Sequence, residues 1–179
     1  MINIIAQSFY FFMIIIILSL FEIQIEGAYP WAEKLPTWRK KIFGFNKDIT
    51  GYHVYLSIFV LLLFHLPFLF GLNYTISNEL KILSLIILIA VYEDFLWNIF
   101  NPNPNYGIIR FKKNYIGLID KFFLFIPVDY LISIILSSLF ALIANEIHWW
   151  TINFTIFLIL TIIISINRYY IDLKNMAKM

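Results

Sequence analysis

The chain has 179 residues, of which 61% are hydrophobic, 20% aromatic and 13% charged. Soluble domains carry about 25% charged residues, so this composition excludes a disordered chain, a nucleic-acid-binding domain and almost any soluble enzyme. The net charge of +2 gives no reason to expect a polyanionic partner, and the lack of cysteine excludes disulfides, thiolate metal sites and cysteine nucleophiles. We therefore predict an integral membrane protein that forms one domain over residues 1–179.

Five apolar stretches are long enough to cross the hydrocarbon core of a bilayer, which takes about 20 helical residues. Each run is continuous, whereas the strands of a membrane barrel alternate between apolar and polar residues. We therefore predict an all-α membrane protein, a bundle of five transmembrane helices. The predicted spans cover residues 2–25, 52–72, 80–100, 122–144 and 149–167.

The basic residues predict the orientation of these spans. All 13 Lys and Arg residues except Lys81 fall in the loop 26–51, in the loop 101–121 or in the tail after residue 167. Basic residues concentrate on the cytoplasmic side of a membrane, so both loops and the C-terminus are predicted to be cytoplasmic and the N-terminus outside. Within the first loop, residues 31–39 could form a short interfacial helix. The expected location is a bacterial plasma membrane.

Ionisable side chains lie in the cytoplasmic halves of four predicted spans. Asp94 and Asp129 lie roughly 10 Å from the cytoplasmic ends of their spans, at about 1.5 Å per residue. Glu22 lies about 5 Å from the cytoplasmic end of the first span, and His53 begins the second. Because ionisable groups inside a membrane are costly, they are functional candidates by default.

Helical spacing predicts which acids face the bundle interior. Small residues at intervals of four mark faces where membrane helices approach one another closely. One such face consists of Asp129, Ser133, Ser137 and Ala141. On the third span, Asp94 shares a face with Asn98, whereas Glu93 is turned about 100° away. We therefore expect Asp94 and Asp129 to converge inside the bundle.

Buried carboxylates require a proton or a cation to compensate their charge. Because no Lys or Arg lies deep in a span, we predict a divalent metal held by Glu22, Asp94 and Asp129. On this hypothesis the catalytic residues are His53, Asp94 and Asp129, with His53 as a ligand or general base. Oxygen ligands suit Mg²⁺ or Mn²⁺, or iron if the imidazole joins them. The predicted substrate-binding residues, which would meet a headgroup, are Arg39, Lys40, Arg110 and Asn98.

Three functions stay open at this point. The first is a membrane-embedded enzyme that acts on a lipid or isoprenoid-type substrate from the cytoplasmic leaflet. The second is a non-catalytic subunit or assembly factor, bound to a partner membrane subunit or to a second copy of the chain. The third is a small proton- or ion-coupled carrier, which the lack of an internal repeat disfavours. In a structural alternative to all three, protonated acids only hold the helices together.

Several short stretches resemble a family of small multi-pass integral membrane proteins, mostly bacterial. They are E-I-Q-I-E-G at 22–27, L-P-T-W-R at 35–39, T-G-Y-H at 50–53, H-L-P at 65–67, E-D-F-L-W at 93–97 and N-P at 101–102. The stretches cover the first three spans and the first inner loop. The resemblance implies a membrane location and assigns no chemistry to any residue.

Overall fold

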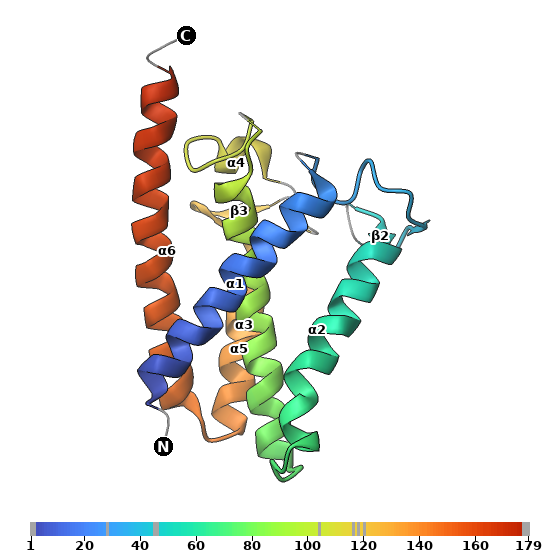
Figure 1. Cartoon of the computed structure of the whole chain (residues 1–179), viewed down its shortest axis with the longest axis vertical. Coiled ribbons are helices and arrows are strands. Elements are labelled where there is room, and N and C mark those ends of the chain that lie inside the picture. The colour runs from blue at the N-terminus through green and yellow to red at the C-terminus, as the bar shows by residue number, and fades with distance from the viewer. Residues whose placement is uncertain are drawn as a thin grey trace. The chain divides into compact units, whose positions relative to one another are not determined.

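The computed structural model describes residues 3–27, 29–44, 47–103, 105–115, 117, 119 and 121–176. Most of these residues are helical (Figure 1). The helices are α1 (Ile4–Glu26), α2 (Gly51–Leu69), α3 (Ile76–Phe100), α4 (Phe111–Asn114), α5 (Val128–Ile143) and α6 (Ile147–Met176). Four of them, α1, α2, α3 and α6, are long and apolar enough to cross a membrane. The chain is a membrane protein, as its composition predicts.

Two short antiparallel strand pairs lie in the loops. They are β1 (Arg39–Lys40) with β2 (Ile49–Thr50), and β3 (Phe122–Phe123) with β4 (Ile126–Pro127). The first pair closes the loop that precedes α2. Turns occupy residues 31–35, where the sequence suggests an interfacial helix, and no helix forms among residues 29–44.

The predicted fourth span differs most from the structure. Its first six residues form the β3–β4 hairpin, and α5 contains only 16 residues. That is about 24 Å of helix, less than the hydrocarbon core of about 30 Å. Pro127 explains the late start, because a proline in the interior of a helix breaks it, and here it immediately precedes the first helical residue. Leu124, with a φ of 59°, turns the chain within the hairpin.

The chain divides into two compact units. Unit 1 contains Met1–Ala28, Ile89–Tyr115 and Thr151–Met179, and unit 2 contains Tyr29–Leu88 and Ile116–Trp150. The first half of α3 therefore belongs to unit 2 and its second half to unit 1. The two units are described separately.

Unit 1 is built on three helical segments that run in the same direction. Ser8 Oγ on α1 donates to Asn153 Oδ1 on α6 at 3.0 Å, and one turn later Phe12 meets Phe157 with ring centroids 5.9 Å apart. Tyr92 joins α3 to this pair through Phe157, at 5.5 Å between centroids. The contacts advance together along α1 and α6, so the two helices are parallel (Figure 1). The predicted topology requires this direction for its first and fifth spans.

Unit 2 uses small polar residues to bring the first half of α3 against α5. Ser84 Oγ donates to the carbonyl of Ser137, and Ser137 Oγ donates to the carbonyl of Ser84, each at 2.7 Å. Trp150 Nε1 donates to Ser137 Oγ at 2.8 Å. Ser137 and Ala141 are completely buried. Ser137 therefore lies in a close helix contact, as expected for the predicted small-residue face, and Ala141 one turn later is buried.

Candidate functional site

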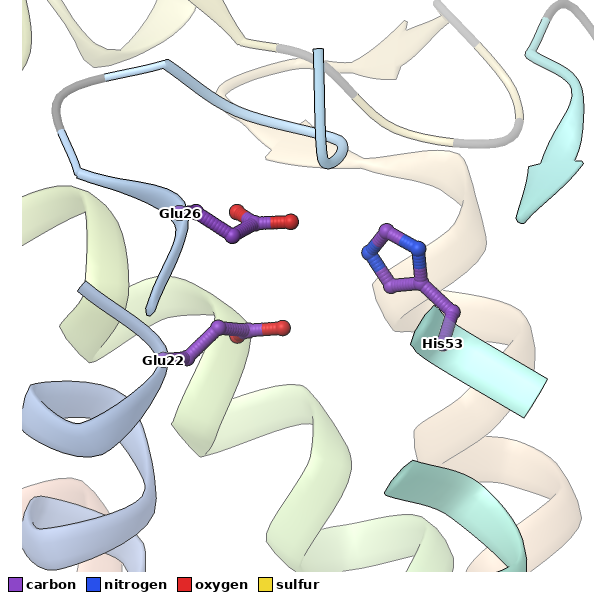
Figure 2. Close-up of side chains that lie close together, drawn as sticks. All are labelled: Glu22, Glu26 and His53. Carbon is purple, nitrogen blue, oxygen red and sulfur yellow. The ribbon is translucent and has the colours of Figure 1, made fainter. Parts of the chain in front are cut away.

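α1 presents one buried face that ends in two acidic residues. The buried positions alternate between spacings of three and four, which keeps them on one side of a helix. They include Ser8, Phe12, Ile15, Ser19, Glu22 and Glu26. Glu22 is 8% exposed and Glu26 is 6% exposed. Figure 2 shows that their carboxylates point to the same side, one turn apart. The helix therefore supplies a pair of buried acids.

A third acid, Glu93 on α3, joins this pair within unit 1. Ser19 Oγ donates to the backbone carbonyl of Glu93 at 3.0 Å, which holds α1 against α3 at this level. One turn further along α1, the side chain of Glu22 lies within hydrogen-bond reach of the Glu93 carboxyl group, and Glu26 is close enough to interact electrostatically. We call Glu22, Glu26 and Glu93 the carboxylate cluster.

The Glu93 side chain carries an unused polar atom. Glu93 Oε1 is buried and has no hydrogen-bond partner within the part of the chain that the structure describes. An ionised carboxylate can only accept hydrogen bonds, so the Glu22–Glu93 contact needs a proton between the two groups or a cation that both can bind. The cluster is therefore chemically suited to hold a proton or a small hard cation.

Glu93, and not only Asp94, contributes an acid on α3 to the interior of unit 1. The sequence predicts that Asp94 faces the bundle interior, because it shares a helix face with Asn98. However, α3 is the most enclosed of the four long helices, so more than one of its faces lies inside the protein. Asp94 is half-buried directly beside Glu93. An acid on α3 can therefore face the protein interior without lying on the Asn98 face.

Asn98 and Arg110 belong to the same unit as the carboxylate cluster. Asn98 is buried, and its Oδ1 accepts the backbone N–H of Gly107 at 3.1 Å. Gly107 has a φ of 109°, and a Cβ there would lie 2.6 Å from Asp172 Oδ2 on α6. Asn98 therefore ties the loop after α3 in place. Arg110 is half-buried at the start of α4. A substrate-binding role for either residue stays a prediction.

His53 lies in the first turn of α2, in unit 2 (Figure 2). Thr50, the residue before the helix, caps it: its side-chain hydroxyl accepts the His53 backbone N–H. The same hydroxyl lies 2.6 Å from His53 Nδ1. The imidazole is tilted against the ring of Trp31, with 4.7 Å between centroids. The orientation of this histidine is thus fixed by neighbours within its own unit.

Asp129, Arg39 and Lys40 also belong to unit 2. Asp129 lies in the first turn of α5, where its Oδ1 accepts the backbone N–H of Tyr130 at 3.0 Å. An acid in this position is favoured by the helix dipole. The Arg39 guanidinium donates to the carbonyls of Trp31 and Ala32 and so braces the loop before α2. Lys40 is exposed.

Two of the stretches that carry the family resemblance meet at the start of α2. Gly51 N–H donates to the carbonyl of Trp38 at 2.9 Å, and Tyr52 N–H donates to Thr37 Oγ1 at 3.0 Å. The Trp38 indole fills the space beside Gly51, because a Cβ at Gly51 would lie 2.7 Å from Trp38 Cε2. L-P-T-W-R and T-G-Y-H therefore form one structural element, which holds the helix turn that carries His53.

The predicted site residues are divided between the two units. Glu22, Asp94, Asn98 and Arg110 lie in unit 1, and His53, Asp129, Arg39 and Lys40 lie in unit 2. The convergence of Asp94 with Asp129 stays a prediction. The predicted metal ligands include neither Glu26 nor Glu93. The four-residue spacing already places Glu26 one turn from Glu22 on the same face of α1, whereas no local sequence signal places Glu93 against α1.

Comparisons with known proteins add no assignment, since no family model, curated protein or solved structure matches this chain. The resemblance to small multi-pass bacterial proteins therefore stays a prediction.

Proposed function

We propose that the carboxylate cluster binds a divalent cation, and that the protein is a membrane-embedded enzyme for a lipid or isoprenoid-type substrate of the cytoplasmic leaflet. The observation that carries the proposal is the buried Glu93 Oε1, which lies beside the Glu22 carboxyl group and has no hydrogen-bond partner among the described residues. Carboxylate oxygens from Glu22, Glu26 and Glu93 suit Mg²⁺ or Mn²⁺. A bound divalent ion would polarise a phosphoryl or carbonyl oxygen of the substrate.

The remaining parts of the proposal rest on the sequence. Asp94 is a further oxygen ligand beside the cluster. His53 is the proposed general base and Asp129 the proposed additional ligand, because both begin helices at the face that the basic residues mark as cytoplasmic. Arg39, Lys40 and Arg110 would attract an anionic headgroup to that face. The proposed location is a bacterial plasma membrane.

A lipid conversion assay tests the enzymatic part of the proposal. The purified protein is reconstituted into vesicles of radiolabelled bacterial lipid extract, with Mn²⁺ or with a chelator, and the lipids are separated by thin-layer chromatography. We expect a new lipid species that requires Mn²⁺ and is absent with Glu93→Gln. The control is Glu33→Gln, which removes an exposed acid outside the cluster. A protein that binds Mn²⁺ but converts no lipid would contradict an enzyme and favour a non-catalytic subunit.

The orientation can be tested because the chain has no native cysteine. We expect a membrane-impermeant maleimide to label Tyr74→Cys from outside intact cells, and to label Lys112→Cys only in inside-out vesicles. Both native side chains are exposed, so access depends on the side of the membrane. Labelling of Lys112→Cys in intact cells would reverse the topology and place the carboxylate cluster at the outer face.

A further inference from the structure

Within the part of the chain that the structure describes, three residues along one face of α3 and its continuation each carry a buried polar atom without a hydrogen-bond partner. The atoms are Glu93 Oε1, Trp97 Nε1 and Asn101 Nδ2. The residues are spaced by four, and Asn101 continues the helical pattern because its N–H donates to the Trp97 carbonyl at 3.0 Å. Such spacing places side chains on the same side of a helix. We call Trp97 and Asn101 the donor pair.

The surroundings of the donor pair hold both side chains in place but leave these N–H groups unused. The Trp97 ring packs edge-on against Tyr106, with 5.4 Å between centroids. Asn101 Oδ1 accepts the backbone N–H of Asn103 at 2.9 Å, which leaves the amide nitrogen on the other side of the group. Trp97 is 6% exposed, and Asn101 is completely buried. Neither unused group can reach bulk water in this conformation.

A buried donor without an acceptor typically costs about 1–3 kcal/mol, and native proteins rarely leave one unsatisfied. An indole N–H and an amide NH₂ can only donate, so the missing occupant must offer acceptor oxygens. The Arg168 guanidinium lies close by, where it donates to the Asn101 carbonyl at 3.3 Å and forms an ion pair with Asp172 at 2.8 Å. The chemistry of the donor pair is therefore that of a site for acceptor oxygens, such as those of a phosphate group.

Glu93, Trp97 and Asn101 lie along one face of α3, from the carboxylate cluster to the end of the helix that is predicted to be cytoplasmic. Glu93 and Asn101 are eight residues apart, or about 12 Å along the helix axis. Lipid phosphates lie at the level of this end of a membrane helix. A cation at Glu93 would also favour a negatively charged ligand on the next turns. The charge of a cation at Glu93, the two N–H donors and their position near the end of α3 thus all favour a lipid phosphate.

We propose that Trp97 Nε1 and Asn101 Nδ2 bind the phosphate oxygens of the lipid substrate, beside the cation of the carboxylate cluster. This inference rests on the proposed function and names its substrate class as a lipid with a phosphate-bearing headgroup. The two residues position the phosphate, and the reacting groups remain those of the cluster.

Nuclear magnetic resonance of the indole N–H groups tests this inference without requiring turnover. The chain has five Trp residues, and loss of one signal in Trp97→Phe identifies the resonance of Trp97. With Mg²⁺ present, we expect that resonance to move when dioctanoyl phosphatidic acid is added. It should stay in place with dioctanoylglycerol, which lacks the phosphate, and with inorganic phosphate alone. A resonance that ignores all three probes would overturn the inference, and one that follows inorganic phosphate would overturn the lipid assignment.

The affinity for dioctanoyl phosphatidic acid should fall about tenfold or more in Trp97→Phe and in Asn101→Asp, because each removes a hydrogen bond to a charged group. The Asp variant keeps the oxygen that accepts from Asn103. Trp150→Phe is the matched control, since its indole N–H already donates to Ser137. An unchanged affinity in both test variants would contradict the site. Mg²⁺ binding with no response to the lipid would leave the cation site standing and remove only this inference.

Discussion

Glu93→Gln is expected to weaken Mn²⁺ binding at least about a hundredfold, as measured by isothermal titration calorimetry of the detergent-purified protein. The substitution keeps the size of the side chain but replaces a charged ligand by a neutral one. Breaking a buried charge interaction from one side typically costs about 3–5 kcal/mol, and every 1.4 kcal/mol is a factor of ten in affinity. Of the three cluster acids, Glu22 and Glu26 lie on α1 and Glu93 lies on α3. Neither acid on α1 can therefore take the position of the Glu93 carboxylate.

Glu22→Gln should produce a loss of similar size, since Glu22 lies within hydrogen-bond reach of Glu93. The double variant should bind little worse than either single variant, because both remove the same interaction. Glu33→Gln should bind Mn²⁺ like the wild-type protein. Equal affinity in wild type and Glu93→Gln, with both proteins monodisperse, would mean that the cluster is only a hydrogen-bonded contact between α1 and α3.

Gly51→Ala is expected to destabilise unit 2 by about 1–3 kcal/mol, the usual cost of overpacking a filled site. The new methyl group would overlap the Trp38 indole, a rigid ring that is 49% exposed and must move as a whole to make room. Thermal unfolding in detergent, followed by circular dichroism, should show a melting temperature lower by several degrees. Because Gly51 begins the helix turn that carries His53, the same change should disturb the environment of that imidazole.

A double variant distinguishes the steric clash with Trp38 from an effect of alanine on the stability of α2 itself. Trp38→Leu creates space beside residue 51, so Gly51→Ala should cost much less in that background than in the wild-type chain. Alanine is otherwise the better helix former. If the two substitutions instead lowered stability additively, the close approach of Trp38 to Gly51 would not be what requires a glycine there.

The long helices could be predicted from the sequence, and the beginning of the fourth apolar stretch could not. Continuous hydrophobicity is sufficient to find α1, α2, α3 and α6, because their residues share one environment over at least 19 positions. Residues 122–127 are equally apolar, yet they form a hairpin in which Leu124 has a positive φ. Hydrophobicity reports the preference for lipid but not the backbone conformation. Pro127 was the local signal for the true start of the helix.

The candidate site could be predicted only where it depends on one helix. Glu22 and Glu26 are visible as a pair because both lie on α1, one turn apart. Glu93 joins them through Ser19, which contacts it from a position 74 residues away in the sequence. Likewise, Trp97 and Asn101 become unusual only once their neighbours are known to leave an N–H group unused. Tertiary contacts of this kind leave no periodic pattern in the sequence.

Elemental analysis of the protein, purified without added metal, incubated with Mn²⁺ and then desalted into metal-free buffer, tests most directly whether α1 and α3 together form a cation site. We expect about one Mn²⁺ per chain in the wild-type protein and in Glu33→Gln, and substoichiometric Mn²⁺ in Glu22→Gln and Glu93→Gln. A wild-type protein that retains no more Mn²⁺ than Glu93→Gln would contradict the proposed function. The contact between Glu22 and Glu93 would then hold a proton rather than a metal ion.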